Sequence, residues 1–146
     1  MLLGHHTLPI HQDGHMVLPS DYRLELSKAG MVLTRGFDRN VMLLTRAAFE
    51  KLCACVRSIS VTDPLGRTLA RMLLGNAVEI KLDRDGIFSV PATLASPAGL
   101  EGEIVVLGQG EYLELWSLSA WKEQEVSLDA AWKDKQHFEK FNVSLA

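Results

Sequence analysis

The sequence of 146 residues has little cysteine and no long apolar run. Its two cysteines, Cys53 and Cys55, fall in a helical pattern, where a spacing of two places their side chains about 200° apart and disfavours a bridge. No apolar run approaches the roughly 20 residues that span a bilayer. The N-terminus also lacks the basic start and long apolar stretch of a signal peptide. These absences predict a reduced, cytoplasmic protein without a membrane segment.

Motifs for catalysis and metal binding are missing as well. The sequence contains no P-loop, no G-x-S-x-G, no H-E-x-x-H and no cysteine nucleophile paired with histidine. Four histidines, His5, His6, His11 and His15, are close in sequence and leave a metal site as an alternative. Adjacent strand residues point to opposite faces, so His5 and His6 would not share a ligand set. We therefore predict no enzyme activity, no metal and no cofactor.

The charge balance excludes a strongly basic nucleic-acid-binding protein, because the net charge is −3. The distribution is uneven. Residues 1–79 carry 9 Lys and Arg against 7 Asp and Glu, whereas residues 80–146 carry 6 against 11. The hydrophobic content of 47% is ordinary for a globular protein, and the length predicts one domain or one pseudo-symmetric pair with a shared core.

What the sequence does contain is an internal duplication. A shift of 72 residues aligns residues 10–19, I-H-Q-D-G-H-M-V-L-P, with residues 82–91, L-D-R-D-G-I-F-S-V-P. The same shift pairs further positions without gaps: Gly30 with Gly102, Gly36 with Gly108, Thr45 with Ser117 and Phe49 with Trp121. A period this long, with two copies, indicates a pseudo-symmetric pair of supersecondary units rather than a solenoid.

Each copy has the same predicted order of elements. An Asp-Gly turn, in which glycine takes a positive φ, precedes a short strand that ends at a proline. A short helix and a β-hairpin come next. The predicted ranges are a first strand within residues 1–9 that ends at Pro9, a helix at 21–29, a hairpin of 31–34 with 41–44, a helix at 92–98 broken at Pro97, and a hairpin of 103–107 with 112–116.

Three longer helices are predicted from their caps and apolar spacing. Thr45 and Ser117 have N-cap chemistry, and Asp63 with Pro64 provides a cap and a first helical position. The last helix is predicted to run past Lys133 into a partly apolar end. The tryptophans are expected in the core or in a subunit interface: Trp116, Trp121 and Trp132.

These elements predict an α+β protein, a single domain over residues 1–146. The first repeat is placed at 5–52, the inter-repeat helices at 53–76, the second repeat at 77–124 and the C-terminal helix or tail at 125–146. A four-stranded unit alone would leave sheet edges unpaired, so the two copies are expected to close on each other.

The segment between the copies carries the most specific pattern. Its positions, which stand at a fixed spacing, are Asp63, Pro64, Arg67, Arg71, residues 73–75, Ala77, Asp83 and Gly86. The M-x-x-G at residues 1–4 and the D-x-x-G turn, strand and proline at 83–91 fit the same pattern. With these residues the chain resembles the MraZ family over residues 1 to 125 or so. The resemblance implies two pseudo-symmetric AbrB-like β-hairpin repeats that form a swapped-hairpin β-barrel with flanking helices.

The resemblance also implies a transcriptional regulator of the bacterial cytoplasm and nucleoid. Members of the family act at the promoter of the division and cell-wall gene cluster, assemble as ring homo-oligomers and bind repeated short DNA elements. Their DNA-contacting signature is an aspartate, three residues and then an arginine, once per repeat. The planar fork of the arginine can grip a phosphate or a guanine edge.

Both signatures are degenerate in this chain. His11 and His15 replace the aspartate and the arginine of the first copy, and Ile87 replaces the arginine of the second. The signature positions are His11, Gly14, His15, Asp83, Gly86 and Ile87. The residues expected to contact DNA instead are Arg84, Lys81, Arg35, Arg39 and His15. A structural or interface role is expected for Arg67 and Arg71.

The missing arginines weaken DNA binding and leave two alternatives open. A bidentate arginine contact is worth about 1–3 kcal/mol per site, although a ring multiplies weak sites. Asp13 and Asp85 in the turns would repel phosphate and favour an oligomer of the same fold that binds a protein partner. A terminal helix that docks a second protein would instead fit an antitoxin-like partner of a toxin. DNA remains the principal predicted partner.

Overall fold

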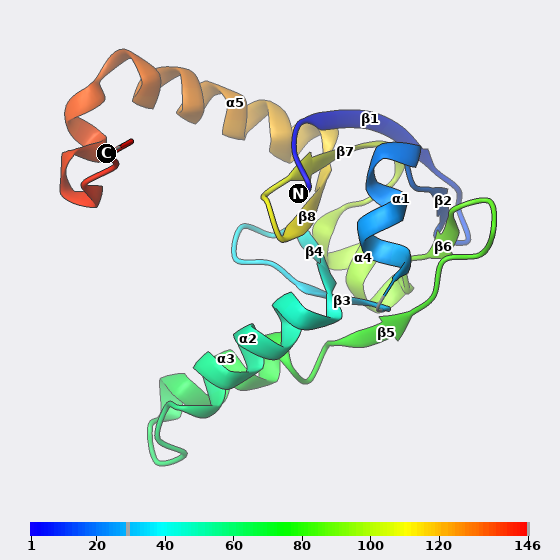
Figure 1. Ribbon diagram of the computed structural model, residues 1–146, viewed down its shortest axis with the longest axis horizontal. Coiled ribbons are helices and arrows are strands. Elements are labelled where there is room, and N and C mark those ends of the chain that lie inside the picture. The colour runs from blue at the N-terminus through cyan, green and yellow to red at the C-terminus, as the bar shows by residue number, and fades with distance from the viewer. Residues whose placement is uncertain (29, 146) are drawn as a thin grey trace.

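The computed structural model describes residues 1–28 and 30–145 (Figure 1). Its strands are β1 (His5–Ile10), β2 (His15–Val17), β3 (Met31–Arg35), β4 (Val41–Thr45), β5 (Val78–Ile80), β6 (Ile87–Ser89), β7 (Gly102–Gly108) and β8 (Tyr112–Ser117). Its helices are α1 (Ser20–Ser27), α2 (Arg46–Arg57), α3 (Pro64–Leu73), α4 (Ala92–Ala98), α5 (Leu118–Lys133) and the 3-10 helix η1 (Lys135–Phe141). The protein is α+β, as predicted.

The strands form one large antiparallel sheet and a small ribbon. The sheet has the order β1-β7-β8-β4-β3-β5, and β2 pairs with β6 in the two-stranded ribbon. Because β1 and β5 lie at the two edges of the sheet, its hydrogen-bonded ladder is open. The closed barrel that the resemblance implies is therefore not confirmed.

Strands from the two halves of the sequence pair with each other. β1 pairs with β7, β5 with β3, β4 with β8 and β2 with β6, all antiparallel. A shift of 72 residues converts β2, His15–Val17, into β6, Ile87–Ser89. The same shift exchanges β1 with β5, β3 with β7 and β4 with β8, which leaves the strand order of the sheet unchanged when it is read from the other edge.

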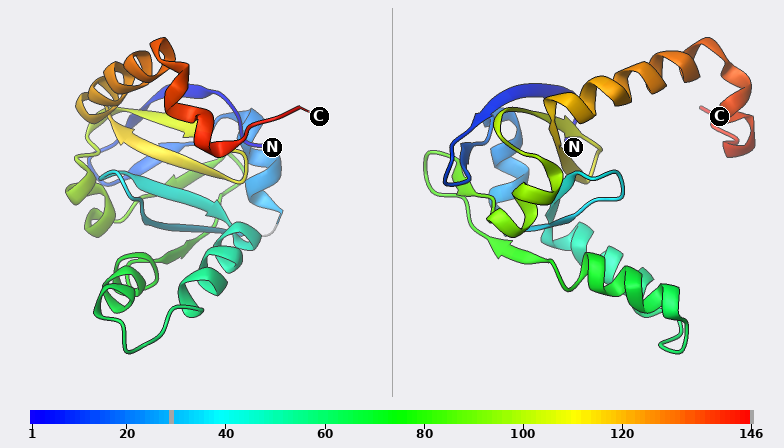
Figure 2. Two further views of the ribbon diagram at one scale, coloured as in Figure 1. Left: turned by 90° about the vertical axis from the view of Figure 1, so that its left-hand side faces the viewer. Right: turned by 180° about the vertical axis from the view of Figure 1, so that it is seen from behind.

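Alternating side chains place apolar residues on both faces of the sheet. In β4, Leu43 faces the ribbon, α1 and α4, whereas Met42 and Leu44 face α2 and α3. The main core lies between the sheet and the ribbon and includes Met16, Leu18, Tyr22, Leu26, Leu33, Leu43, Phe88, Leu94, Ile104 and Leu113. Trp116 and Trp121 form a further cluster with Val105, their rings 5.8 Å apart. The α2–α3 pair and α5 project from this body (Figure 2).

Side-chain caps fix the starts of the longer helices. The Thr45 hydroxyl accepts a hydrogen bond from the Ala48 N–H, and the Ser117 hydroxyl accepts one from the Ala120 N–H. These bonds satisfy donors that the first turn of a helix leaves free. Both predicted caps are confirmed. Trp116 is buried as predicted, but Trp132 is 84% exposed and does not belong to the core of this chain.

Three predicted boundaries are wrong. β1 continues through Pro9 to Ile10, because an edge strand tolerates the missing N–H of proline. α4 includes Pro97, which lies one residue from its C-terminal end, where little of the helix remains to be broken. α5 ends at Lys133 and a 3-10 helix follows, so the α-helix does not run further. The predicted end of the helix at Ala29 lies outside the described residues.

None of the helices in the described part of the chain is long and apolar enough to cross a membrane.

Candidate nucleic-acid interface

The β2–β6 ribbon brings the two degenerate signatures onto one surface. Met16 pairs with Phe88 at the centre of the ribbon, and both side chains are buried in the main core. Side chains alternate along a strand, so the residues on either side of this pair face outward. His15, which pairs with Ser89, and Ile87, which pairs with Val17, therefore share the outer face at opposite ends of the ribbon.

The turn before β6 (residues 83–86) is held by the carboxylate of Asp83. One oxygen of this group accepts the N–H of Asp85 at 2.8 Å and the N–H of Ile87 at 2.9 Å. The Gly86 N–H donates to the Asp83 carbonyl at 3.1 Å, and Gly86 has a φ of 77°. The retained signature aspartate thus caps its own turn.

The turn before β2 (residues 11–14) replaces this cap with a different one. Asp13 accepts the backbone N–H of His15 at 3.1 Å, and its other oxygen lies 2.9 Å from Nδ1 of the same histidine. The hydrogen bond from the His15 backbone, followed by that from its side chain, lowers the pKa of Asp13. His11 contributes through its backbone carbonyl, which accepts the Gly14 N–H at 2.9 Å. The negative charge of the Asp13 carboxylate is therefore engaged by His15 within the turn.

Each turn is also fastened to the strand end of the other half. The Leu18 N–H donates to the Gly86 carbonyl at 2.9 Å, and the Val90 N–H donates to the Gly14 carbonyl at 2.9 Å. Leu18 and Val90 are 72 residues apart, as are Gly14 and Gly86. The two bonds are thus equivalent, and they make the position of each turn depend on the other half of the chain.

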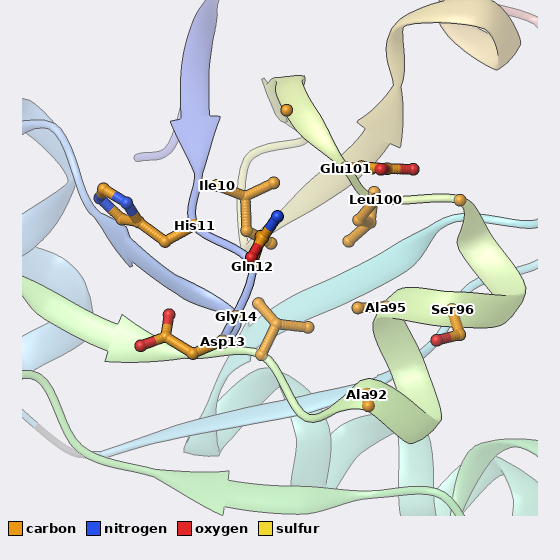
Figure 3. A pocket seen from close by; sticks show the side chains of 13 residues that line it. Ile10, His11, Gln12, Asp13, Gly14, Ala92, Ala95, Ser96, Leu100 and Glu101 are labelled. Atoms are coloured by element: carbon orange, nitrogen blue, oxygen red, sulfur yellow. The ribbon is translucent and has the colours of Figure 1, made fainter.

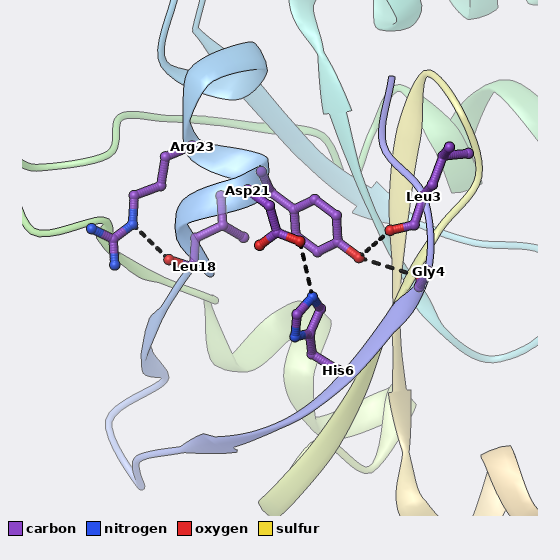
Figure 4. Close-up of polar contacts among 7 residues, drawn as sticks. Leu3, Gly4, His6, Leu18, Asp21 and Arg23 are labelled. Atoms are coloured by element: carbon purple, nitrogen blue, oxygen red, sulfur yellow. Dashed lines mark hydrogen bonds and ion pairs between the residues drawn. The ribbon is translucent and has the colours of Figure 1, made fainter.

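Sequence reasoning missed Arg23, which lies directly against the turn at residues 83–86. Its Nε donates to the Leu18 carbonyl at 2.7 Å (Figure 4). A Cβ added to Gly86 would lie 2.3 Å from the same Nε, so the guanidinium covers this glycine. One feature of the sequence could have drawn attention to Arg23: the 72-residue shift aligns it with Ala95, so the two copies differ at this position.

The predicted DNA-contacting cations fall into two groups. Arg84 is in the turn at 83–86 and Lys81 follows β5, and both are exposed beside Arg23 and the ribbon. Arg35 is the last residue of β3, and Arg39 follows it in the β3–β4 loop.

The spacing along β3 separates the two groups. β5 pairs with the start of β3 through Ile80 and Met31, next to Lys81. Arg35 is four residues further along β3, a distance of about 13 Å at the usual rise of a strand. The structure thus gathers Arg84, Lys81 and Arg23 at one turn and leaves Arg35 and Arg39 at another edge of the molecule.

Comparison with known proteins identifies the family. A relative from Thermomicrobium roseum, "Transcriptional regulator MraZ", is 36% identical over 130 residues, which are 89% of this chain and 91% of that protein. The chain belongs to the MraZ family. The family model "MraZ protein, putative antitoxin-like" matches residues 73–141. Relatives of the same name from Roseiflexus castenholzii and Herpetosiphon aurantiacus are 35% and 31% identical, over 89% and 84% of this chain and 90% and 85% of those proteins.

The residues that carried the MraZ resemblance between the two halves shape the start of α3. The Asp63 carboxylate accepts the N–H groups of Leu65 at 2.9 Å and Gly66 at 3.3 Å. Arg67 donates to the Val61 carbonyl at 2.9 Å and closes the loop before the helix. Arg71 is exposed, and in the described part of this chain neither arginine forms an ion pair. An interface role for these two arginines stays a prediction.

The described residues, 1–28 and 30–145, contain no group of three or more His, Cys, Asp or Glu side chains that could hold a metal ion. His6 instead lies 3.3 Å from Asp21, and His15 lies against Asp13. Cys53 and Cys55 are both free, in agreement with the prediction from their spacing.

Proposed function

We propose that this MraZ-family protein is a DNA-binding transcriptional regulator that uses the outer face of the β2–β6 ribbon. The observation that carries the proposal is the position of exposed His15 and half-buried Ile87 on one outer face, with Arg84, Lys81 and Arg23 beside it. The names of the relatives support the same function. Its site of action would be the cytoplasm and nucleoid, at the promoter of the division and cell-wall gene cluster.

The chemistry of the ribbon face suits contacts to DNA phosphates better than base readout. Arginine and lysine at a turn can donate to phosphate oxygens, which positions a protein on DNA without reading sequence. The carboxylates beside them are partly occupied, because Asp83 accepts two backbone N–H groups and Asp13 is engaged by His15. Each turn would therefore bind weakly, and several copies would be needed for useful affinity.

Self-association into a ring would supply those copies. The C-terminal part of the chain exposes large apolar side chains, among them Val126 at 70%, Trp132 at 84% and Phe141 at 61%. A separate apolar cavity of about 400 Å³ lies beside α3, between Ile59, Leu69 and Met72. Two different apolar surfaces on one chain favour head-to-tail contacts, which close into a ring or extend into a filament.

The repeat organisation is part of the same proposal. The first repeat would span 5–52 and the second 77–124, with inter-repeat helices at 53–76 and a C-terminal helix and tail at 125–146. The exchange of strand partners between the halves supports a swapped-hairpin arrangement, in which the ribbon covers the open side of the sheet. Each ribbon face would then need both repeats, so a single repeat would not bind DNA.

The test is to restore the missing arginines and to measure binding to the DNA upstream of the protein's own gene by fluorescence anisotropy. His15→Arg and Ile87→Arg should each raise affinity by roughly 5-fold to 150-fold, the value of a bidentate arginine contact. Val61→Arg is the matched control, because it adds the same charge at a residue that is 76% exposed and remote from the ribbon. Arg84→Ala should weaken binding.

Two results would contradict the proposal. If Val61→Arg raised affinity as much as the ribbon variants, the gain would come from net charge and not from the ribbon face. If none of the arginine variants bound DNA more tightly, the outer face of the ribbon would not meet DNA. The protein-binding alternative would then be preferred, since acidic Asp13 and Asp85 flank the same turns.

A further inference from the structure

His15 and Asp13 form a close pair in the turn before β2. The Asp13 carboxylate accepts the backbone N–H of His15 through one oxygen, and its other oxygen lies 2.9 Å from Nδ1 of the ring. Both side chains are exposed, at 51% for His15 and 66% for Asp13. The His11 N–H donates to the His15 carbonyl at 2.9 Å and closes the turn. The imidazole is thus held in one orientation at the position of the first missing arginine.

The state of Asp13 determines which ring nitrogen of His15 carries a proton. The hydrogen bond from the His15 backbone, followed by that from its side chain, lowers the pKa of Asp13, so the carboxylate stays ionised at neutral and mildly acidic pH. The hydrogen between the two groups therefore belongs to Nδ1. In the neutral ring Nε2 is then an acceptor, and in the described part of the chain it has no hydrogen-bond partner. In the protonated ring Nε2 becomes a donor.

Protonation of His15 changes in two ways how this pair would meet a phosphate. With a neutral ring, the pair presents a lone pair on Nε2 and the uncancelled negative charge of Asp13, and both repel an anion. With a protonated ring, it presents a charged N–H donor, and the positive charge cancels that of Asp13. Hydrogen bonds from charged donors to phosphate are among the strong ones in proteins. Both changes therefore favour phosphate at the protonated pair.

The strands that pack against β2 place no other charged group on this imidazole. β6, which pairs with β2, consists of Ile, Phe and Ser and has no titratable side chain. On β1, the ring of His5 lies 6.1 Å from that of Trp121, and Nε2 of His6 lies 3.3 Å from the Asp21 carboxylate. Both histidines of β1 are thus engaged by other elements.

The loops around the pair add three charged or titratable groups. His11 is exposed in the same turn and, by its charge, acts on Asp13 in the same direction as the pair itself. Glu101 lies on the other side of the cavity that adjoins the turn, as Figure 3 shows. Asp85 belongs to the other turn, before β6. Asp13 is therefore the charged group in direct contact with the imidazole.

We propose that His15 and Asp13 form a proton-dependent phosphate contact, through which DNA binding becomes tighter as the pH falls from about 8 to about 6. The inference rests on the proposed function of the ribbon face. As the pH rises, the imidazole loses its proton, the donor at Nε2 disappears and the charge of Asp13 is no longer cancelled. Arg84, Lys81 and Arg23 at the second turn keep their charges over this range, so the response belongs to the first turn.

The test compares affinities for the upstream DNA at about pH 6 and about pH 8 by fluorescence anisotropy. The wild type should bind roughly ten-fold or more tightly at the lower pH, the value of a hydrogen bond from a charged donor. His15→Gln, which cannot become charged, and His15→Arg, which is always charged, should lose most of this difference. His137→Gln should keep it, because His137 lies 3.4 Å from Asp134 in a similar exposed pair at the far end of the molecule from the ribbon (Figure 1).

Proton uptake on binding provides a second measurement. By linkage, a phosphate that prefers the protonated imidazole must also increase the protonation of that imidazole. Titration calorimetry in buffers of different ionisation enthalpy, at about pH 7, counts the protons that are taken up when DNA binds. The wild type and His137→Gln should take up more protons than His15→Gln or His15→Arg.

The outcomes separate this contact from DNA binding itself. The inference is overturned if the affinity of His15→Gln falls with pH as steeply as that of the wild type, and DNA binding by the ribbon would still stand. It is also overturned if His15→Arg binds at both pH values while the wild type binds at neither, again with the ribbon as the DNA-binding face. If no variant binds DNA at either pH, the proposed function fails and the phosphate contact fails with it.

Discussion

Substitution of Gly86 by alanine tests how the second turn is built. Gly86 has a φ of 77°, and an added Cβ would lie 2.3 Å from Nε and 2.7 Å from Cζ of Arg23. The left-handed backbone alone costs an alanine about 1–2 kcal/mol. The Arg23 side chain must also move, and its hydrogen bond to the Leu18 carbonyl contributes about 1.5–3 kcal/mol as a bond from a charged donor.

The expected loss for Gly86→Ala is therefore about 2.5–5 kcal/mol of unfolding free energy. Gly110→Ala is the matched control, because Gly110 has a φ of 87° and no atom within 4 Å of an added Cβ. It should lose only about 1–2 kcal/mol. Both variants are compared by denaturant unfolding at one protein concentration, since self-association would otherwise shift the apparent stability.

A double variant isolates the contribution of the guanidinium. In an Arg23→Ala background, Gly86→Ala should lose only the backbone cost, about 1–2 kcal/mol, because the clash has been removed. Equal losses for Gly86→Ala in both backgrounds would refute the contact between Arg23 and the turn. A loss for Gly86→Ala no larger than that for Gly110→Ala would refute it as well.

Two further predictions concern the body of the fold. Leu73, the last residue of α3, is fully buried in the apolar cluster that α2 and α3 form with β4. Leu73→Ala should therefore cost about 2–5 kcal/mol in denaturant unfolding, and a loss below about 1 kcal/mol would mean that this pair does not pack as described. Burial raises the pKa of Glu114 above its usual 4.5, although hydrogen bonds from Trp116 and Asn40 act in the opposite direction. Because the pKa of Glu114 is higher in the folded than in the unfolded protein, its stabilising contribution to the unfolding free energy is complete below about pH 4.5. This contribution is lost as the pH rises through the folded pKa. Glu114→Gln should remove this part of the pH dependence of the unfolding free energy. If the unfolding free energies of Glu114→Gln and the wild type differed by the same amount at about pH 4 and at about pH 7, this prediction would be wrong.

Local chemistry made much of the fold predictable from the sequence. Thr45 and Ser117 cap helices because a short hydroxyl side chain satisfies free N–H groups wherever a helix starts. The Asp-Gly turns follow in the same way from the positive φ of Gly14 and Gly86. Pro97 was misjudged because the effect of a proline depends on how much helix remains after it, which the sequence pattern does not fix.

The site was less predictable because it depends on contacts between distant segments. The pairing of β2 with β6 places His15 and Ile87 on one face, and nothing local to either strand specifies that partner. Arg23 on α1 contacts the turn of residues 83–86, although the two are separated in the sequence by more than half of the 72-residue repeat period. Only the mismatch between Arg23 and Ala95 under the 72-residue shift could have drawn attention to this residue.

The most direct test of DNA binding through the ribbon face is a salt titration of binding to the protein's own upstream DNA. We predict binding whose affinity falls with salt, with a slope of several units when the logarithm of the affinity is plotted against the logarithm of the salt concentration, because each phosphate contact contributes about 0.9 to the slope. Arg84→Ala should reduce that slope by about one for each subunit in contact with DNA. An absence of binding at about 50 mM salt, from a protein that still sediments as a large assembly, would contradict DNA binding by the ribbon.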